Sequence, residues 1–224
     1  MRLMVPEIEN NKYQHQRLQA IRSAATVFAE KGFHGSSTKD IAERMGIKQG
    51  SLYYYFKSKE EALGEVCLFG ITDYVDRMSG IAASDQPFEA KLMATITSHL
   101  SSYREKNEAL KVYNDERLYL PEAKRTTLKS LGSGYRQLLE KIFEEGVRSG
   151  ALRDSIDCHF AAQAVIGICN AWGDVIVRDP DVDLFDIIQK CTDLLLNGFC
   201  ERRKIQRTDD KTDVAGNEKS KLRN

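Results

Sequence analysis

Apolar residues recur at helical spacing in every long segment of this chain that has a clear period, and this pattern constrains the fold more than any other feature. One such stripe consists of Leu18, Ile21, Ala25 and Phe28. A spacing of three or four residues places these side chains on one face of an α-helix. No segment shows the alternation of apolar and polar residues, bounded by hairpin signals, that marks a half-buried strand. The sequence therefore predicts an all-α fold.

Helix start and stop signals divide the first sixty residues into short pieces. Gly32 and Gly46 stand where helix ends favour a left-handed residue, and Ser36 and Ser37 each offer an N-cap for the second helix. Ser58, with Glu61 three residues later, has the capping-box pattern that opens a longer helix. The helices expected before that point cover about residues 16–31, 38–45 and 49–56. Two short helices around a glycine turn, braced by a longer one, are the plan of a helix-turn-helix DNA-binding domain, which we place at residues 13–60.

The rest of the chain predicts a larger helical domain, residues 61–205, with five or so further helices. The breaks between them are expected at residues 85–87, 121, 132–134, 146–150 and 179–183, where proline, glycine or aspartate interrupts the helical pattern. From about residue 206 to residue 224 the chain has almost no apolar side chains. This tail is predicted to be disordered.

Charge is unevenly distributed along a chain whose formal net charge is +0. Residues 1–60 contain 10 Lys+Arg and 6 Asp+Glu, a net charge of +4, so that the remaining residues carry −4. A basic head on an acidic body is what a DNA-facing module attached to another domain would show.

The cysteines and the N-terminal sequence indicate the cellular compartment of the protein. The 5 cysteines are odd in number and contain no C-x-x-C pair, which disfavours a disulfide framework and a zinc site. His99 and His159 have no ligand partner at i+3 or i+4, and nothing indicates a metal or a cofactor. We find neither a signal peptide nor a run of roughly 18 apolar residues that would suggest a membrane span. We expect a cytoplasmic protein that does not bind membranes.

The third expected helix has the two faces that a recognition helix needs. Leu52 and Phe56 can dock on the domain, while Gln49 points outward with the paired donor and acceptor that an adenine edge requires. Gly50 allows the backbone to approach the groove closely. The consecutive Tyr53, Tyr54 and Tyr55 supply phenol hydroxyls suited to phosphates. Lys59 and Thr38 each stand at the start of a helix, where backbone N–H groups help to hold a phosphate.

The segment AATVFAEKGFHGSSTKDIAERMGIKQGSLYYYFKSKEEAL, residues 24–63, resembles the signature of the TetR family almost throughout. The resemblance implies a dimeric repressor whose C-terminal domain binds an effector. By position it places base contacts on Lys39, Lys48, Gln49, Gly50, Ser51 and Tyr53. It places phosphate contacts on Thr38, Tyr54, Tyr55 and Lys59. Tyr55 departs from the family, since many members have histidine at this position.

Two features of the second domain suggest a dimer interface and a ligand pocket. Small residues in segment 157–177, together with the amphipathic segment 184–199, predict a four-helix seam between two subunits, by analogy with the family. Segment 113–120, YNDERLYL, resembles the middle helix of TetR-type regulators of lipid or sterol breakdown that respond to acyl-CoA thioesters. The expected pocket residues are aromatic and polar side chains within apolar helices: Tyr103, Tyr113, Asn114, Asp115, Glu116, Tyr119 and Trp172. The alternative is a polar cluster satisfied within the helix bundle.

These observations favour a ligand-responsive repressor that leaves a palindromic DNA operator when a small hydrophobic effector binds. Two other classes of protein are less well supported by the sequence. An enzyme would require a motif such as G-x-S-x-G, a glycine-rich phosphate loop or H-E-x-x-H, and the chain has none of these. A helical ligand-binding or partner-binding module without DNA-binding function would have a degraded recognition helix, whereas Lys48, Gln49 and Ser51 are all present.

Overall fold

The computed structural model describes residues 5–179 and 181–198 of the chain. Every regular element within these ranges is helical, which confirms the predicted all-α fold. The elements are α1 (Val5–Lys31), α2 (Thr38–Met45), α3 (Gln49–Leu52), α4 (Lys59–Ala83), α5 (Phe88–Glu105), α6 (Asn107–Glu116), the short 3₁₀ helix η1 (Arg117–Tyr119), α7 (Glu122–Arg148), α8 (Cys158–Arg178) and α9 (Leu184–Asn197). The tail predicted to be disordered, residues 206–224, lies outside the described residues.

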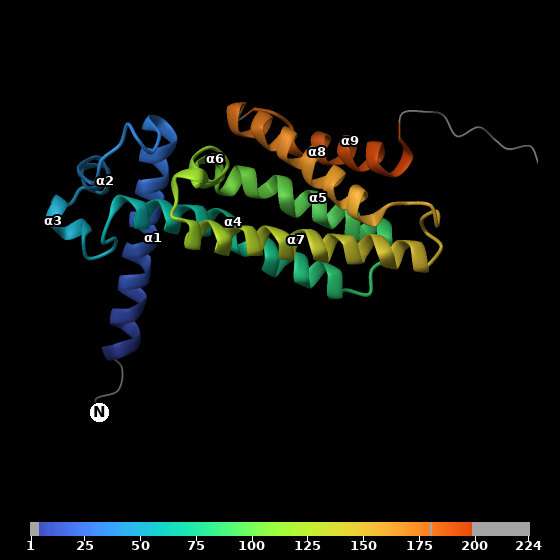
Figure 1. Ribbon diagram of the computed structural model, residues 1–224, viewed down its shortest axis with the longest axis horizontal. Helices are drawn as coiled ribbons and strands as arrows, with labels where there is room; N and C mark the ends of the chain where they lie inside the picture. The colour runs from blue at the N-terminus through green and yellow to red at the C-terminus, as the bar shows by residue number, and fades with distance from the viewer. Residues whose placement is uncertain (1–4, 180, 199–224) are drawn as a thin grey trace, which may run out of the picture.

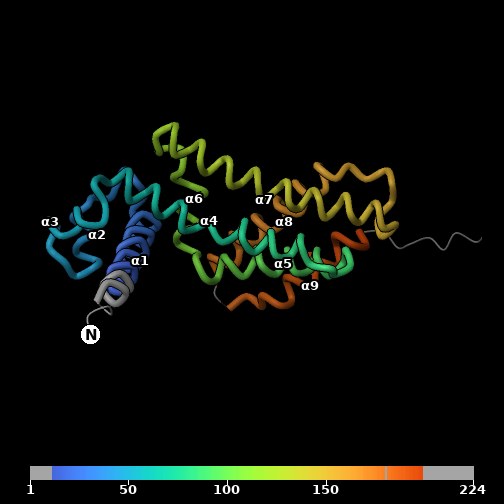
Figure 2. Tube along the Cα trace, turned by 90° about the horizontal axis from the view of Figure 1, so that it is seen from below, coloured from blue at the N-terminus to red at the C-terminus, as the bar shows by residue number. Residues whose placement is uncertain are grey.

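A small head of α1, α2 and α3 lies at one end of an elongated helical body (Figure 1). Helix α4 starts in the head, where it packs on α1, and continues into the body beside α7. Helix α8 packs on α5 and α7, and α9 packs on α5. Figure 2 shows the same arrangement from below, with α1 nearly end-on and α5 close to α4. Since α4 belongs to both parts, it is a mechanical link between them.

The head is held by a compact apolar core in which α3 is anchored by its inward residues. Phe28 of α1, Ile41 of α2 and Leu52 of α3 are almost completely buried, as is Phe56 just after α3. Burial of side chains of this size contributes roughly 1.5–3 kcal/mol each. The predicted inward face of the third helix is therefore confirmed.

The predicted turn between α2 and α3 is also confirmed. Gly46 ends α2 with a φ of 71°, and its N–H bonds back to carbonyl oxygens of the last turn. Only glycine adopts this left-handed conformation without steric cost. The chain therefore reverses within a few residues and delivers Gln49 to the start of α3.

Helix α3 is shorter than the 49–56 span that the sequence predicts. It ends at Leu52, and residues 53–55 form tight turns in which the Tyr54 and Tyr55 N–H groups bond three residues back, at 3.2 and 2.9 Å. Burial of Phe56 and the Ser58 cap of α4 fix the chain soon afterwards. The tertiary attachment of the next helix therefore ends α3 early.

Helix α7 runs without interruption through Gly132 and Gly134, so the predicted break at residues 132–134 is wrong. A glycine inside a helix costs roughly 1 kcal/mol relative to alanine. The buried stripe of Leu128, Tyr135 and Leu139 packs against the body on both sides of these glycines. Packing of the stripe outweighs the local preference of the glycines.

Two further features differ from expectation. Helix α1 starts at Val5, well before the expected residue 16. Helix α8 is, by length and composition, apolar enough to cross a membrane, contrary to our finding of no such run in the sequence. One of its faces, with Val165, Cys169 and Ile176, is buried on the body. A core helix of a folded domain meets the same criterion, so α8 is weak support for a membrane span.

Candidate nucleic-acid interface and effector cavity

Helix α2 is fixed at its N-terminus by a capping box. The Ser37 hydroxyl accepts a hydrogen bond from the Asp40 N–H at 3.2 Å, and the Asp40 carboxylate accepts one from the Ser37 N–H at 2.7 Å. The Lys31 ammonium also donates to Asp40, and together with Ser37 it holds the pKa of this carboxyl well below its usual range. The start of α2 is thus tied to the end of α1.

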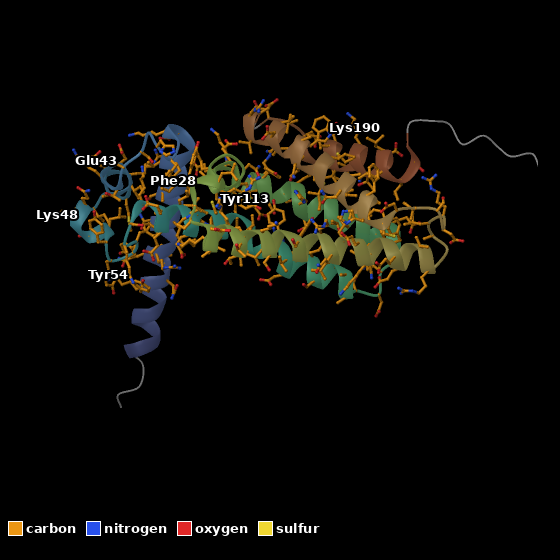
Figure 3. All side chains as sticks on the ribbon, in the orientation of Figure 1. Phe28, Glu43, Lys48, Tyr54, Tyr113 and Lys190 are labelled. Atoms are coloured by element: carbon orange, nitrogen blue, oxygen red, sulfur yellow. The ribbon has the colours of Figure 1, made fainter. Side chains whose placement is uncertain are left out.

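The residues expected to read DNA gather at the free end of the head, where Figure 3 labels Lys48 and Tyr54. The predicted base-contacting residues are all exposed: Lys39, Lys48, Gln49, Gly50, Ser51 and Tyr53. Thr38, for which a phosphate contact is predicted, is half-buried. The Gln49 side-chain amide donates to the Thr38 hydroxyl at 3.0 Å, so α2 and α3 are joined at this surface. A Cβ at Gly50 would meet nothing within 4 Å. Packing within the head therefore gives no reason for glycine there, whereas close approach to another molecule would.

Two predicted phosphate-contacting residues make contacts within the protein. The Tyr55 side chain is half-buried, and its hydroxyl lies 3.4 Å from the Gln16 amide oxygen. The Lys59 ammonium donates to the carbonyl oxygens of Phe33 and Ser36, at 2.8 and 2.9 Å, and so braces the loop before α2. An ammonium has three N–H donors. A phosphate contact by Lys59 therefore remains a prediction that depends on the third donor.

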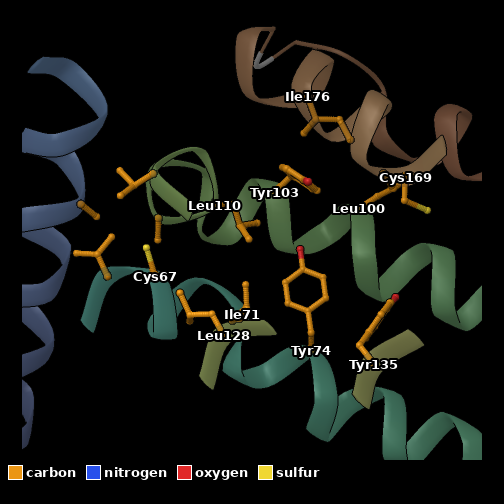
Figure 4. Close-up of a cluster of buried hydrophobic side chains, with 14 of the residues drawn as sticks. Cys67, Ile71, Tyr74, Leu100, Tyr103, Leu110, Leu128, Tyr135, Cys169 and Ile176 are labelled. Atoms are coloured by element: carbon orange, nitrogen blue, oxygen red, sulfur yellow. The ribbon is translucent and has the colours of Figure 1, made fainter. Parts of the chain in front are cut away.

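A cavity of about 510 Å³ lies in the body between α4, α5, α6, α7 and α8. Its apolar wall includes Ile71, Val75, Leu110, Leu131 and Ile166. Of the side chains that the sequence predicts for the pocket, Tyr103, Tyr113 and Asn114 line it. Figure 4 shows Tyr103 near Tyr74 and Tyr135, which also line the cavity. An apolar space with a few polar groups is the usual form of a small-molecule site.

The other residues predicted for the pocket do not line this cavity: Asp115, Glu116, Tyr119 and Trp172. Glu116 instead lies beside the head, where its carboxylate would be 3.3 Å from a Cβ built on Gly32. Trp172 is on the partly exposed side of α8, whereas the buried side carries Cys169 and Gly173. The rotation of each helix about its axis determines which residues face the cavity. The prediction used only the aromatic or polar character of the residues, which does not specify that rotation.

Four polar side chains form a hydrogen-bonded group in the cavity wall, and sequence reasoning predicted only Tyr103 among them. His99 Nδ1 lies 3.0 Å from the Tyr135 hydroxyl, and His99 Nε2 lies 3.1 Å from the Asn170 side-chain oxygen. The Tyr103 hydroxyl donates to the same oxygen at 3.1 Å. Since that oxygen only accepts, Nε2 carries the proton and Nδ1 accepts from Tyr135. Burial lowers the pKa of His99 to about 4, so the imidazole is neutral near pH 7.

The sequence does contain one signal for this group, since His99 and Tyr103 lie one turn apart on the same helix, α5. No cluster of metal-binding side chains occurs among the residues described. The four described cysteines are free thiols. Burial raises the pKa of Cys67 to about 12, which makes that thiol unreactive near neutral pH.

Basic side chains occur along the same cavity. Arg117, Lys129 and Arg136 all line it. The Arg117 guanidinium lies over the Tyr113 ring, 5.2 Å from its centroid, and donates to the Tyr113 carbonyl at 3.0 Å. Arg136 donates to Glu140 at 3.2 Å. An apolar space with three basic groups at its wall suits an amphiphile that has an apolar part and an anionic part.

Comparison with known proteins identifies the family. Residues 20–66 match the model described as bacterial regulatory proteins, tetR family, and residues 85–174 match the model described as tetracyclin repressor-like, C-terminal domain. The chain is 33% identical over 147 residues to the HTH-type transcriptional repressor KstR2 of Rhodococcus jostii, covering 65% of this chain and 72% of that repressor. The chain belongs to the TetR family of bacterial transcription regulators.

Other TetR-family relatives extend over more of the chain. The fatty acid metabolism regulator protein of Bacillus subtilis is 26% identical over 186 residues, covering 81% of this chain and 94% of the relative. The crystal structure of the transcriptional regulator FadR from Bacillus subtilis in complex with stearoyl-CoA is 27% identical, with a TM-score of 0.69 over 82% of this chain and 99% of that chain. These relatives are named as regulators and not as enzymes.

Proposed function

We propose that this TetR-family protein is a dimeric repressor that binds a palindromic operator through α2 and α3 and releases it when an acyl-CoA enters the body cavity. The proposed class of ligand rests on the lining of the cavity, in which an apolar wall occurs together with the basic Arg117, Lys129 and Arg136. An acyl chain suits the apolar wall, and the phosphates of coenzyme A suit the basic groups. The stearoyl-CoA bound by the Bacillus relative supports the same class of ligand.

DNA binding is supported by the exposed surface of the head. We assign base contacts to Lys39, Lys48, Gln49, Gly50, Ser51 and Tyr53, and phosphate contacts to Thr38, Tyr54, Tyr55 and Lys59. Two heads must lie roughly 34–36 Å apart to enter successive major grooves on one face of DNA. A ligand that favours another separation of the heads therefore weakens operator binding.

Helix α6 supports a route from the cavity to the head. Leu110, Tyr113 and Asn114 of α6 line the cavity. From the same helix, Glu108 accepts a hydrogen bond from Thr26 at 3.0 Å, and Lys111 donates to the Ala29 carbonyl at 2.9 Å. Both partners belong to α1. A ligand that displaces α6 would therefore move α1 and, with it, α2 and α3.

To test this proposal, an operator is first selected from a pool of random duplexes at a defined salt concentration. Its release from the protein is then measured by fluorescence anisotropy of the labelled operator. Acyl-CoA thioesters of increasing chain length are titrated, and coenzyme A and the matching free fatty acids serve as controls. We expect release by thioesters of one range of chain lengths and by neither control alone. Isothermal titration that detects no binding of any medium-chain or long-chain thioester would contradict the proposed ligand.

A pair of variants links release to the cavity. Lys129 is an exposed lysine that lines the cavity, and Lys141 is an exposed lysine of the same helix that is absent from its lining. We expect Lys129→Gln to raise the thioester concentration needed for release and Lys141→Gln to leave it unchanged. Both variants should bind the operator as the unmodified protein does.

A further inference from the structure

The N-terminal part of α1 extends beyond what the head needs for its core. Helix α1 begins at Val5, whereas the first fully buried side chain described in it is Ala20. Figure 1 shows this part of α1 projecting from the head on the side away from α8 and α9. Packing of the three head helices therefore does not account for it.

One residue of this extension contacts the chain just after the recognition helix. The Tyr13 ring meets the Tyr54 ring edge-on, with centroids 5.4 Å apart, and stacks on Tyr55 at 6.3 Å. One turn further along α1, Gln16 accepts the hydrogen bond from the Tyr55 hydroxyl. Helix α3 has a single turn of its own, so these contacts help to set the position of residues 53–55.

The surface around Tyr13 is exposed and suited to DNA phosphates. Tyr54 keeps 71% of its surface exposed despite its contact with Tyr13. Lys12 and His15, on either side of Tyr13, are exposed, and so is Lys57 after the tyrosines. Lysine beside a groove-binding element typically contacts the phosphate backbone without regard to sequence.

We propose that the N-terminal part of α1 is a second DNA-binding element, in which Tyr13 positions Tyr54 and Tyr55 and Lys12 contacts a backbone phosphate. The inference rests on the proposed operator binding. Because α8 and α9 are the proposed dimer seam, this element lies on the outer side of each head. The DNA phosphate that Lys12 contacts therefore lies outside the half-site, away from the centre of the operator.

The first experiment varies the length of the DNA around the selected operator. One duplex ends at the operator, and another continues on each side for half a helical turn, roughly five base pairs. We expect the full-length protein to bind the longer duplex more tightly in anisotropy titrations. Lys12→Ala should remove this gain and reduce the salt slope by about one, while Lys141→Ala on α7 should change neither.

The second experiment tests the positioning role of Tyr13. Tyr13→Ala should weaken operator binding about two- to tenfold, the usual range for loss of an aromatic pair. Binding to random DNA should be weakened less. Tyr13→Phe keeps the ring and should restore the ratio of operator to random affinity. A role in folding alone would instead lower the unfolding temperature and reduce both affinities equally.

The outcomes separate this inference from the function on which it rests. One outcome is that the unmodified protein selects an operator but binds the short and long duplexes with equal affinity. If the Tyr13 and Lys12 variants then bind as tightly as the unmodified protein, the proposal of a second DNA-binding element is wrong. If the unmodified protein selects no sequence at any salt concentration, operator binding itself is wrong.

Discussion

At the scale of single residues, Gln49 allows a specific prediction about the base preference of the DNA-facing surface. Its amide N–H bonds to Thr38 in the free protein, which leaves the second N–H and the carbonyl oxygen for an adenine edge. We expect Gln49→Ala to relax the preference at one position of each half-site, at a cost of about 1–3 kcal/mol on the preferred base. Selection from a random pool measures this preference, with Gln137→Ala on α7 as the control. Equal loss on operator and random DNA would contradict direct base readout.

His99 predicts a pH dependence of stability. Its pKa is lowered to about 4 by burial, so as pH falls from about 6.5 the unfolded chain takes up a proton before the folded protein does. The folded state should therefore be fully stable above pH 6.5 and lose about 3 kcal/mol between pH 6.5 and 4. Urea unfolding across this range measures the loss. His99→Gln should show a shallower dependence, and an unchanged slope would mean that other groups are responsible.

At the scale of elements, two glycines in adjacent helices should respond in opposite directions to alanine. A Cβ at Gly134 in α7 would meet nothing within 4 Å, so Gly134→Ala should raise the free energy of unfolding by about 0.5–1 kcal/mol. A Cβ at Gly173 in α8 would lie 2.3 Å from the Tyr103 ring, so Gly173→Ala should lower that free energy by about 1–3 kcal/mol. Denaturant titrations of both variants check this. Equal effects would mean that α8 does not pack on Tyr103 as described.

At the scale of the whole molecule, the exposed apolar side of α8 and α9 predicts the dimer. Phe160 and Phe185 are 71% and 70% exposed in the single chain. We expect a dimer at micromolar concentration and a monomer with weak operator binding for the double variant Phe160→Asp, Phe185→Asp, because two linked heads bind more tightly than one. Light scattering measures the mass. Leu118→Asp, which changes an equally exposed apolar residue of η1, should stay dimeric.

Local features of the head were predictable from the sequence because they depend on neighbouring residues. The Ser37 cap, the left-handed Gly46 and the Ser58 cap are each fixed within about four residues of the chain. Leu52 and Phe56 are both buried, as their spacing of four residues predicts, although Phe56 lies just after the end of α3. The family signature of residues 24–63 likewise lies in one continuous segment. The sequence by itself therefore determined the all-α class, the plan of the head and the family.

Only the tertiary structure decided which residues form the cavity. His99 meets Tyr135 and Asn170 from positions 36 and 71 residues away, and no local pattern specifies such a distance. Tyr103 and Asn114 face the cavity while Trp172 does not, because packing sets the rotation of each helix about its axis. The same long-range packing carried α7 through its glycines and ended α3 after one turn. A sequence pattern places a residue on a helix, and the burial of neighbouring helices then determines what that residue meets.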